Sequence, residues 1–315
     1  MTAAVDAAVS LHGLRRWFGD VHAVDGLTFE VARGELFGVV GPDGAGKTTT
    51  LRMLAGVLRP TGGDAFVGGI SVRDDPEGVK LHIAYMSQRF GLYTDLTVRE
   101  NIDFYADLYL VPGAQRAARV ERLYAFSGLG PFRDRLAGQL SGGMKQKLGL
   151  CCALVHEPEI MLLDEPTFGV DPISRRDLWL IVHEMVASGI TVVVATAYLD
   201  EAERCDRVAM LHEGHLIALD APAGLQARLA GRIQIVATDA PRQAREFLVR
   251  NPRVQNAVLF GNVIHATLEN AARDWPVVEA AAEAAGLTLR REVLAEPSLE
   301  DAFIDLVREA NLAPR

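Results

Sequence analysis

The sequence is poor in cysteine and contains no long apolar run. Its three cysteines are Cys151, Cys152 and Cys205, and no two of them form a CxxC pair. This spacing excludes a disulfide framework and disfavours a zinc site, so we expect a reducing compartment such as the cytosol. The longest uncharged stretch, residues 185–199, is interrupted by a Ser-Gly pair and falls short of the roughly 18 apolar residues of a membrane span. The N-terminus has no basic region typical of a signal peptide.

Positive charge is also in deficit. The chain has 32 Lys and Arg against 41 Asp and Glu, a net charge of −9. A protein that follows a nucleic-acid backbone needs a basic surface, so we expect no nucleic-acid partner. With 49% hydrophobic and 23% charged residues, the chain can bury a core and is not typical of disordered proteins. Its 315 residues suggest two domains, at about 100–200 residues each.

Short apolar runs alternate with helical patterns over the first two thirds of the chain. The runs at 160–163 and 191–196 are continuously apolar or β-branched, which is typical of strands buried on both faces of a sheet. A capping box, Thr97 to Glu100, predicts the start of a helix. Strands alternating with helices predict a largely parallel α/β sheet. The other expected elements are strands at 27–31 and 36–40 and a helix at 48–58.

The last third has a different pattern, with a boundary expected near residues 224–232. Strand and helix signals there follow the order βαββαβ and end in a helix, as in ferredoxin-like folds. We therefore expect an α/β domain at residues 1–228 and a small α+β ferredoxin-like regulatory or dimerisation domain at 233–315. The expected elements are residues 233–237, 241–250, 254–260, 263–268, 275–285, 287–294 and, for the last helix, 299–308.

A glycine-rich turn follows the run at 36–40 and fits the pattern GxxxxGK(S/T). Its glycines let backbone N–H groups surround phosphate oxygens at a helix N-terminus. Lys47 supplies charge to the β- and γ-phosphates, and the Thr48 hydroxyl ligates Mg²⁺. The alternative is an accidental glycine-rich turn, which the strand before it and the helix after it disfavour. The expected ATP-binding residues here are Gly41, Pro42, Asp43, Gly44, Ala45, Gly46, Lys47, Thr48 and Thr49.

The apolar run at 160–163 ends in two carboxylates, Asp164 and Glu165. A strand of this kind delivers side chains to the carboxyl edge of the sheet, where ligands of α/β folds bind. Asp164 is then expected to hold Mg²⁺, mostly through water, and Glu165 to orient or deprotonate the attacking water as the catalytic base. Alone, such a pair is more often an exposed turn. The phosphate loop in the same chain favours the catalytic interpretation.

A further stretch, Leu-Ser-Gly-Gly-Met at 140–144, precedes a segment that is helical to about residue 155. With the two motifs above, the chain over about residues 8–225 resembles the ATP-binding subunit of an ABC transporter. Residues 41–48 match its Walker A motif, 160–165 its Walker B motif, and 140–144 its signature; Gln88 matches the Q-loop and residues 168–172 the D-loop. The resemblance implies a P-loop NTPase fold of the ABC type with a helical signature subdomain.

The resemblance also implies a mechanism that needs two copies of the domain. They pair head to tail, so that Ser141, Gly142 and Gly143 face the ATP of the other copy, and Asp171 belongs to the D-loop between them. Gln88 would sense Mg²⁺ and the attacking water, and residues 89–94 would line the groove for a coupling helix of a membrane permease. Phe18 would stack on adenine; the alternative is a core phenylalanine beside Trp17.

Two positions depart from the family pattern: Met144 stands where the signature usually has glutamine, a smaller departure, and the other concerns the switch histidine. The switch histidine expected after the run at 191–196 is replaced by Ala197. A methyl group cannot donate a hydrogen bond to a γ-phosphate, and such donors are a large catalytic term. Three alternatives remain open. In the first, Glu165, Lys47 and the signature of a second copy suffice for ATP hydrolysis at a reduced rate. In the second, a more complete ATPase half works beside this one. In the third, Tyr198 or Thr196 partly substitutes for the histidine.

Two stretches resemble the type-2 exporter and drug-resistance branch of the family: Met144 to Lys147, and residues 296–303. This resemblance implies an ATPase, bound peripherally to the cytoplasmic face of the membrane, that drives efflux of a drug-like or amphipathic substrate. Its partners would be a separate permease and a second ATP-binding subunit, identical or not. The alternatives are an importer, a soluble ABC-type assembly or regulatory factor, and a subunit that uses ATP as a clamp with impaired hydrolysis.

Overall fold

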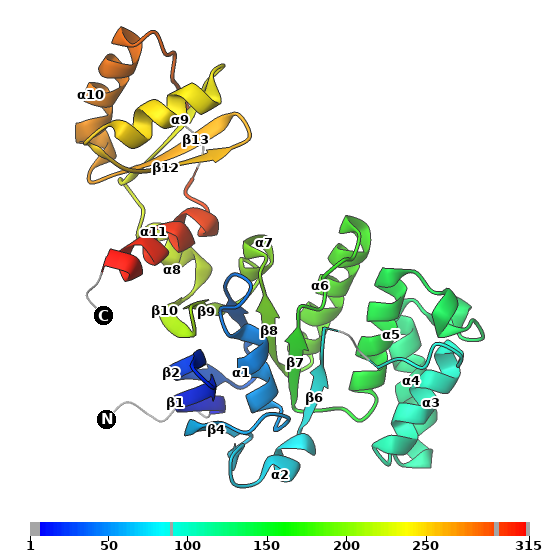
Figure 1. Cartoon of the computed structure of the whole chain (residues 1–315). Helices are drawn as coiled ribbons and strands as arrows, with labels where there is room; N and C mark the ends of the chain where they lie inside the picture. The colour runs from blue at the N-terminus through cyan, green and yellow to red at the C-terminus, as the bar shows by residue number, and fades with distance from the viewer. Residues whose placement is uncertain (1–6, 89–90, 293–295, 313–315) are drawn as a thin grey trace. The chain divides into compact units, whose positions relative to one another are not determined.

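The computed structural model describes residues 7–88, 91–292 and 296–312 and divides the chain into two compact units (Figure 1). The units are Met1–Leu219 and Asp220–Arg315. The sequence placed the boundary between residues 228 and 233. The structure instead assigns helix α8 (Pro222–Ala227) to the second unit.

A six-stranded sheet forms the centre of the first unit, with the order β10-β9-β3-β8-β7-β6. The pairs β9–β3, β3–β8, β8–β7 and β7–β6 are parallel. Every residue of β3, β7 and β8 is buried, as the continuous apolar runs predicted. The strands are β3 (Leu36–Val40), β6 (Ile83–Met86), β7 (Ile160–Asp164), β8 (Thr191–Thr196), β9 (Arg207–His212) and β10 (His215–Asp220).

Helix α1 (Lys47–Leu54) packs between the parallel sheet and an antiparallel sheet of order β2-β1-β4-β5. Both sheets and α1 contribute to one hydrophobic core, which includes Leu11, Leu27, Leu51, Leu162 and Val193. The sequence predicted a helix that continues to residue 58. The helix instead ends at Leu54, because Gly56, two residues further on, takes a left-handed φ of 64°. The strands are β1 (Ala7–Phe18), β2 (Val21–Ala32), β4 (Gly62–Val67) and β5 (Ile70–Ser71).

The signature stretch belongs to a helical part of the first unit, which consists of α3, α4, α5 and α6. The capping box predicted at Thr97 is present: the Glu100 N–H donates to Thr97 Oγ1 at 3.2 Å, and the Thr97 N–H donates to Glu100 Oε2 at 2.8 Å. Helix α5 begins at the signature and packs against α3, α4 and α6. The other α-helices of this unit are α2 (Pro76–Lys80), α3 (Val98–Leu108), α4 (Gly113–Ser127), α5 (Gly142–Leu154), α6 (Pro172–Ala187) and α7 (Leu199–Ala202).

The second unit follows the βαββαβ order and ends in helix α11 (Leu299–Leu312). Its antiparallel sheet has the order β12-β13-β11-β14, that of a ferredoxin-like fold. The strand predicted at 287–294 is present only as β14 (Arg290–Arg291) among the described residues, and 293–295 lie outside them. The remaining elements are β11 (Ile233–Ala237), α9 (Pro241–Arg250), β12 (Val254–Phe260), β13 (Val263–Leu268) and α10 (Ala271–Ala284).

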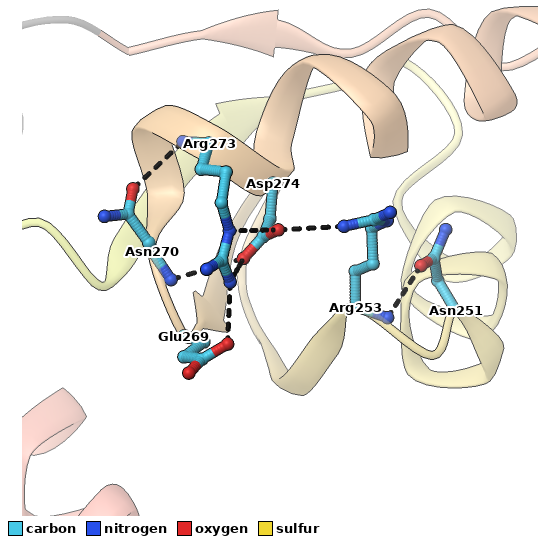
Figure 2. A network of polar contacts seen from close by, with 6 residues as sticks. All are labelled: Asn251, Arg253, Glu269, Asn270, Arg273 and Asp274. Carbon is cyan, nitrogen blue, oxygen red and sulfur yellow. Dashed lines mark hydrogen bonds and ion pairs between the residues drawn. The ribbon is translucent and has the colours of Figure 1, made fainter.

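Helix α10 is capped by Asn270, and its first turn carries a buried carboxylate, Asp274, which Figure 2 shows between two arginines. The Arg273 Nε donates to Asp274 Oδ1 at 3.0 Å, and an Arg253 guanidinium nitrogen donates to the same oxygen at 3.0 Å. The hydrogen bond from Arg273 is the largest cause that lowers the pKa of Asp274, to about 2. The stabilisation from this ionised carboxylate is therefore present near neutral pH and is lost only as the pH falls towards 2.

Candidate active site

The glycine-rich loop follows β3 at the carboxyl edge of the parallel sheet and leads directly into α1. Two of its glycines are required by close backbone contacts. A Cβ on Gly41 would lie 2.3 Å from the Leu211 carbonyl oxygen, and a Cβ on Gly46, whose φ is 101°, would lie 2.4 Å from the Ala23 carbonyl oxygen. The loop is thus held between β9 and β2, with its backbone curved around the helix N-terminus.

A cavity of about 700 Å³ opens over this loop. Its volume lies within the range of about 300–1,000 Å³ typical of small-molecule sites. Most of the predicted nucleotide residues line it, whereas Phe18, Gly41, Pro42 and Ala45 are not among the lining residues. The lining residues are Val21, His22, Ala23, Asp43, Gly44, Gly46, Lys47, Thr48, Thr49, Gln88, Glu165, Phe168 and Glu213.

Lys47 is the cation of this cavity, and only 4% of its side chain is exposed. Its Nζ donates to the carbonyl oxygens of Gly41 at 2.8 Å and Pro42 at 3.0 Å. The same atom lies 3.6 Å from Glu165 Oε1. The two backbone carbonyl groups therefore fix the position of the ammonium group close to the carboxylate of Glu165. An anion bound in this cavity would contact a charge whose position is already fixed.

Thr48 and Asp164 form a pair of oxygen ligands beside Lys47. The Thr48 hydroxyl donates to Asp164 Oδ1 at 2.8 Å, and the Tyr85 hydroxyl donates to Asp164 Oδ2 at 3.2 Å. Burial, with the charge of Asp164 next, raises the pKa of Tyr85 to about 12, so the phenol keeps its proton. No group of three or more His, Cys, Asp or Glu that could hold a metal occurs among the described residues. One hydroxyl and one carboxylate fit Mg²⁺, which keeps several waters and takes other ligands from phosphate.

Glu165 is held in an unusual backbone conformation, with a φ of 50°. Its N–H donates to the Ala195 carbonyl oxygen at 2.9 Å, and Gln88 Nε2 donates to its Oε2 at 3.0 Å. Non-glycine residues with positive φ are uncommon and occur often at functional sites. The structure therefore brings Gln88, Glu165 and Lys47 together. Arg89 and Phe90, at the start of the expected permease groove, lie outside the described residues.

The signature stretch does not line this cavity. Ser141 caps α5, with its Oγ accepting from the Met144 N–H at 3.3 Å, and both Ser141 and Gly142 are exposed. Gly143 is buried, and a Cβ on it would lie 2.3 Å from the Ser174 side chain of α6. The N-terminal end of α5 is thus exposed and takes no part in the nucleotide cavity of its own chain.

Asp171 caps α6 beside that stretch. Its Oδ1 accepts hydrogen bonds from the Ser174 N–H at 3.0 Å and the Ile173 N–H at 3.1 Å. The bond from Ser174 is the largest of the causes that lower the pKa of Asp171. In this structure the predicted D-loop aspartate thus acts as a helix cap.

Phe18 lies at the end of β1 and is 47% exposed, so it is not a core residue. The Arg16 guanidinium carbon lies 4.5 Å from its ring centroid. Phe18 itself is not among the cavity-lining residues, but its strand partner Val21 is, together with His22, whose ring stacks on Trp17 at 4.4 Å. No sequence motif pointed to Val21, His22 or Ala23, because their position follows from the hairpin between β1 and β2.

Ala197 is exposed and directly follows β8. The two residues considered as substitutes for an imidazole are engaged elsewhere. The buried Thr196 hydroxyl donates to Glu201 Oε2 at 2.8 Å, and the Arg175 guanidinium carbon lies 4.6 Å from the Tyr198 ring centroid. Neither residue lines the nucleotide cavity, and nor does the short side chain of Ala197. This arrangement disfavours Thr196 and Tyr198 as donors to a bound phosphate.

Comparison with known proteins agrees with these motifs. A family model described as "ABC transporter" matches residues 24–168. The probable multidrug ABC transporter ATP-binding protein YbhF of Escherichia coli (strain K12) is 43% identical over 306 residues, which cover 96% of this chain and 52% of that protein. This chain thus spans about half the length of that relative. Daunorubicin resistance ATP-binding protein DrrA3 of Streptomyces coeruleorubidus is 34% identical over 304 residues, 96% of either chain.

Solved structures also resemble this chain. A dimeric ATP-binding cassette in a post-hydrolysis state, bound to ADP and Pi, matches with a TM-score of 0.61 and 25% identity. The match covers 68% of this chain and 98% of that one. Within the part of the chain that the structure describes, no helix has both the length and the apolar character of a membrane span.

Proposed function

This chain belongs to the ABC transporter family, and on that premise we propose that it is the ATP-binding, ATP-hydrolysing subunit of an exporter. In this proposal ATP hydrolysis drives efflux of a drug-like or amphipathic substrate through a separate membrane permease. The observation that carries the ATPase part is one cavity in which Lys47 lies 3.6 Å from Glu165 and Thr48 is bonded to Asp164. The relatives named for multidrug and daunorubicin resistance support export rather than import.

The chemistry assigns each side chain a separate task. The N–H groups at the start of α1 and the Lys47 ammonium bind the phosphates and neutralise charge that develops on the γ-phosphate. Glu165 accepts a proton from the attacking water, and the hydrogen bond from Gln88 fixes the orientation of its carboxylate. Thr48 and Asp164 would hold Mg²⁺, which neutralises phosphate charge when bound.

Two partners complete the proposal. The exposed ends of α5 and α6 would face the nucleotide of a second ATP-binding subunit, which is the role proposed for Ser141, Gly142, Gly143 and Asp171. The dimeric cassette bound to ADP and Pi supports such a pairing. The permease would hold the protein at the cytoplasmic face of the membrane. A patch of exposed apolar side chains on α3 and the loops beside it suits that contact: Tyr93, Phe104, Leu108, Tyr109 and Leu110.

A second candidate function is favoured by Ala197. Without an imidazole at this position, ATP would close the dimer as a clamp while hydrolysis stays slow. The two candidates differ in turnover and not in ATP binding, because the missing donor acts mainly on the transition state.

Export is tested in cells that express this chain together with a candidate membrane permease. We expect a lower accumulation of amphipathic dyes than in cells with the permease alone. Lys47→Ala should abolish the difference, because it removes the charge at the phosphate site. The matched control is Lys80→Ala, which removes an exposed lysine whose partner is Glu77. Equal efflux with Lys47→Ala and the unaltered chain would refute an ATP-driven role.

We propose that the second unit is a separately folding regulatory or dimerisation domain. Its own hydrophobic core, which includes Val236, Ile264 and Trp275, supports this proposal. The nucleotide cavity is lined only by residues between Val21 and Glu213. A chain that ends at Asp220 should therefore stay soluble and bind ATP within about threefold of the full-length affinity, as measured by titration calorimetry. Aggregation or loss of nucleotide binding would show that the two units depend on each other for folding.

A further inference from the structure

A second cavity, of about 660 Å³, lies in the first unit at the end of the parallel sheet opposite the phosphate loop. Glu159, Ile190 and Thr191, where β7 and β8 begin, line it, whereas Asp164 and Thr196 end the same strands. At about 3.3 Å per residue, the five residues of β7 place it roughly 15 Å from the nucleotide cavity. The two cavities share no lining residue.

The walls of this cavity are largely apolar. Leu123 and Leu154 lie on α4 and α5, Met185 lies on α6, and all three are buried. Phe126 and Ile190, which also line the cavity, are half-buried. Five apolar side chains from three helices and one strand start thus form a lining that suits the body of a hydrophobic small molecule.

The electrostatics of the cavity favour a cation. It lies against the C-terminal ends of α4, α5 and α6, through Phe126, Leu154 and Met185 in the last turns of these helices. A helix C-terminus carries partial negative charge, so three of them at one cavity attract positive charge.

The charged side chains around the cavity add to this preference. Arg33 pairs with Glu159 at 3.3 Å, and Glu157 pairs with both Arg122 and Arg119, the latter at 2.7 Å. Glu184, on the last turn of α6, has no ion-pair partner among the residues that the structure describes. Each arginine that lines the cavity has a carboxylate partner, so the carboxylate of Glu184 is the lining charge that remains available to a ligand. Glu157 also has a positive φ of 57°, a strained conformation of the kind found at binding sites.

We propose that this cavity binds a lipophilic organic cation, with its apolar body against Leu123, Leu154 and Met185 and its positive charge beside Glu184. The inference does not depend on the proposed function, because neither nucleotide nor a second copy takes part in the site. The ligand class is set by the combination of an apolar lining, three helix C-termini and one unpaired carboxylate.

Two probe ions of nearly the same size and shape test this proposal. Tetraphenylphosphonium and tetraphenylborate differ mainly in the sign of their charge, so a comparison separates the electrostatic preference from hydrophobic adsorption. Titration calorimetry of the full chain without nucleotide should show saturable binding of one tetraphenylphosphonium, at least about tenfold tighter than that of tetraphenylborate. Equal affinities for the two ions, or no saturable binding of the cation, would overturn the proposal.

Variants then place the binding in this cavity. Glu184→Gln should weaken tetraphenylphosphonium binding about fivefold, the upper range for an exposed ion pair. Glu121→Gln, an exposed residue of α4 outside this cavity, should change it less than about twofold. Ser188→Trp should prevent binding, because the indole would occupy the mouth of the cavity. ATP affinity verifies that each variant is folded. Unchanged cation binding in both Glu184→Gln and Ser188→Trp would show that the cation binds elsewhere.

Discussion

Replacing Ala197 with histidine is expected to raise the ATP turnover of the isolated protein, by as much as about 10²–10³-fold, the contribution of one side-chain donor to developing charge. ATP affinity should change little, because the donor acts on the transition state more than on the bound substrate. Ala197 is exposed at the end of β8, so the backbone has room for a larger side chain. The gain will be smaller if the ring displaces Tyr198 from its contact with Arg175.

Ala197→Phe is the matched control, since it adds a ring without a hydrogen-bond donor. It should leave turnover at the level of the unaltered chain. A steady-state phosphate-release assay on the isolated proteins measures all three. A folded Ala197→His variant with unchanged turnover would mean that another group already supplies the donor. Fast hydrolysis by the unaltered chain alone would contradict the idea of an impaired site.

The second large effect concerns Glu165. Glu165→Gln should lower turnover by about 10²–10⁴-fold, the usual contribution of a general base, because the amide cannot accept a proton from water. ATP binding should be retained, since the amide has nearly the same shape and Lys47 keeps its bonds to the carbonyl oxygens of Gly41 and Pro42. The variant should accumulate as an ATP-bound dimer, detectable by light scattering.

Glu121→Gln controls for the loss of a carboxylate that has no place at the nucleotide cavity. Its turnover should equal that of the unaltered chain. Wild-type hydrolysis by Glu165→Gln would show that Glu165 is not the base. Loss of ATP binding in this variant would show instead that the carboxylate has a structural role, through its contacts with Gln88 and Lys47.

Much of the fold could be predicted from the sequence because its signals are local. The buried strands β3, β7 and β8 are continuous apolar runs, and the start of α3 is encoded in four residues of a capping box. The phosphate loop is likewise a local motif, because the pattern GxxxxGK(S/T) lies within consecutive residues, 41–48. These features depend on neighbours in the chain, and single-sequence patterns report them well.

The features that escaped prediction depend on residues distant in sequence. His22 reaches the nucleotide cavity only because β1 and β2 form a hairpin beside α1. Gly143 is required by Ser174 on another helix, a contact that no spacing reveals. The cavity at the opposite edge of the sheet is assembled from three helix ends and two strand starts. Its lining residues include no motif, so only the fold brings them together.

We propose that the cavity over the phosphate loop hydrolyses ATP with Glu165 as the base and that this reaction lacks the donor that a histidine at position 197 would supply. Turnover of the double variant Ala197→His/Glu165→Gln tests this claim most directly. If both residues act on one reaction, the turnover gained through the histidine requires the carboxylate, and the double variant should fall to the level of Glu165→Gln alone. A double variant that keeps the raised rate of Ala197→His would contradict the claim, because the added turnover would then not depend on Glu165.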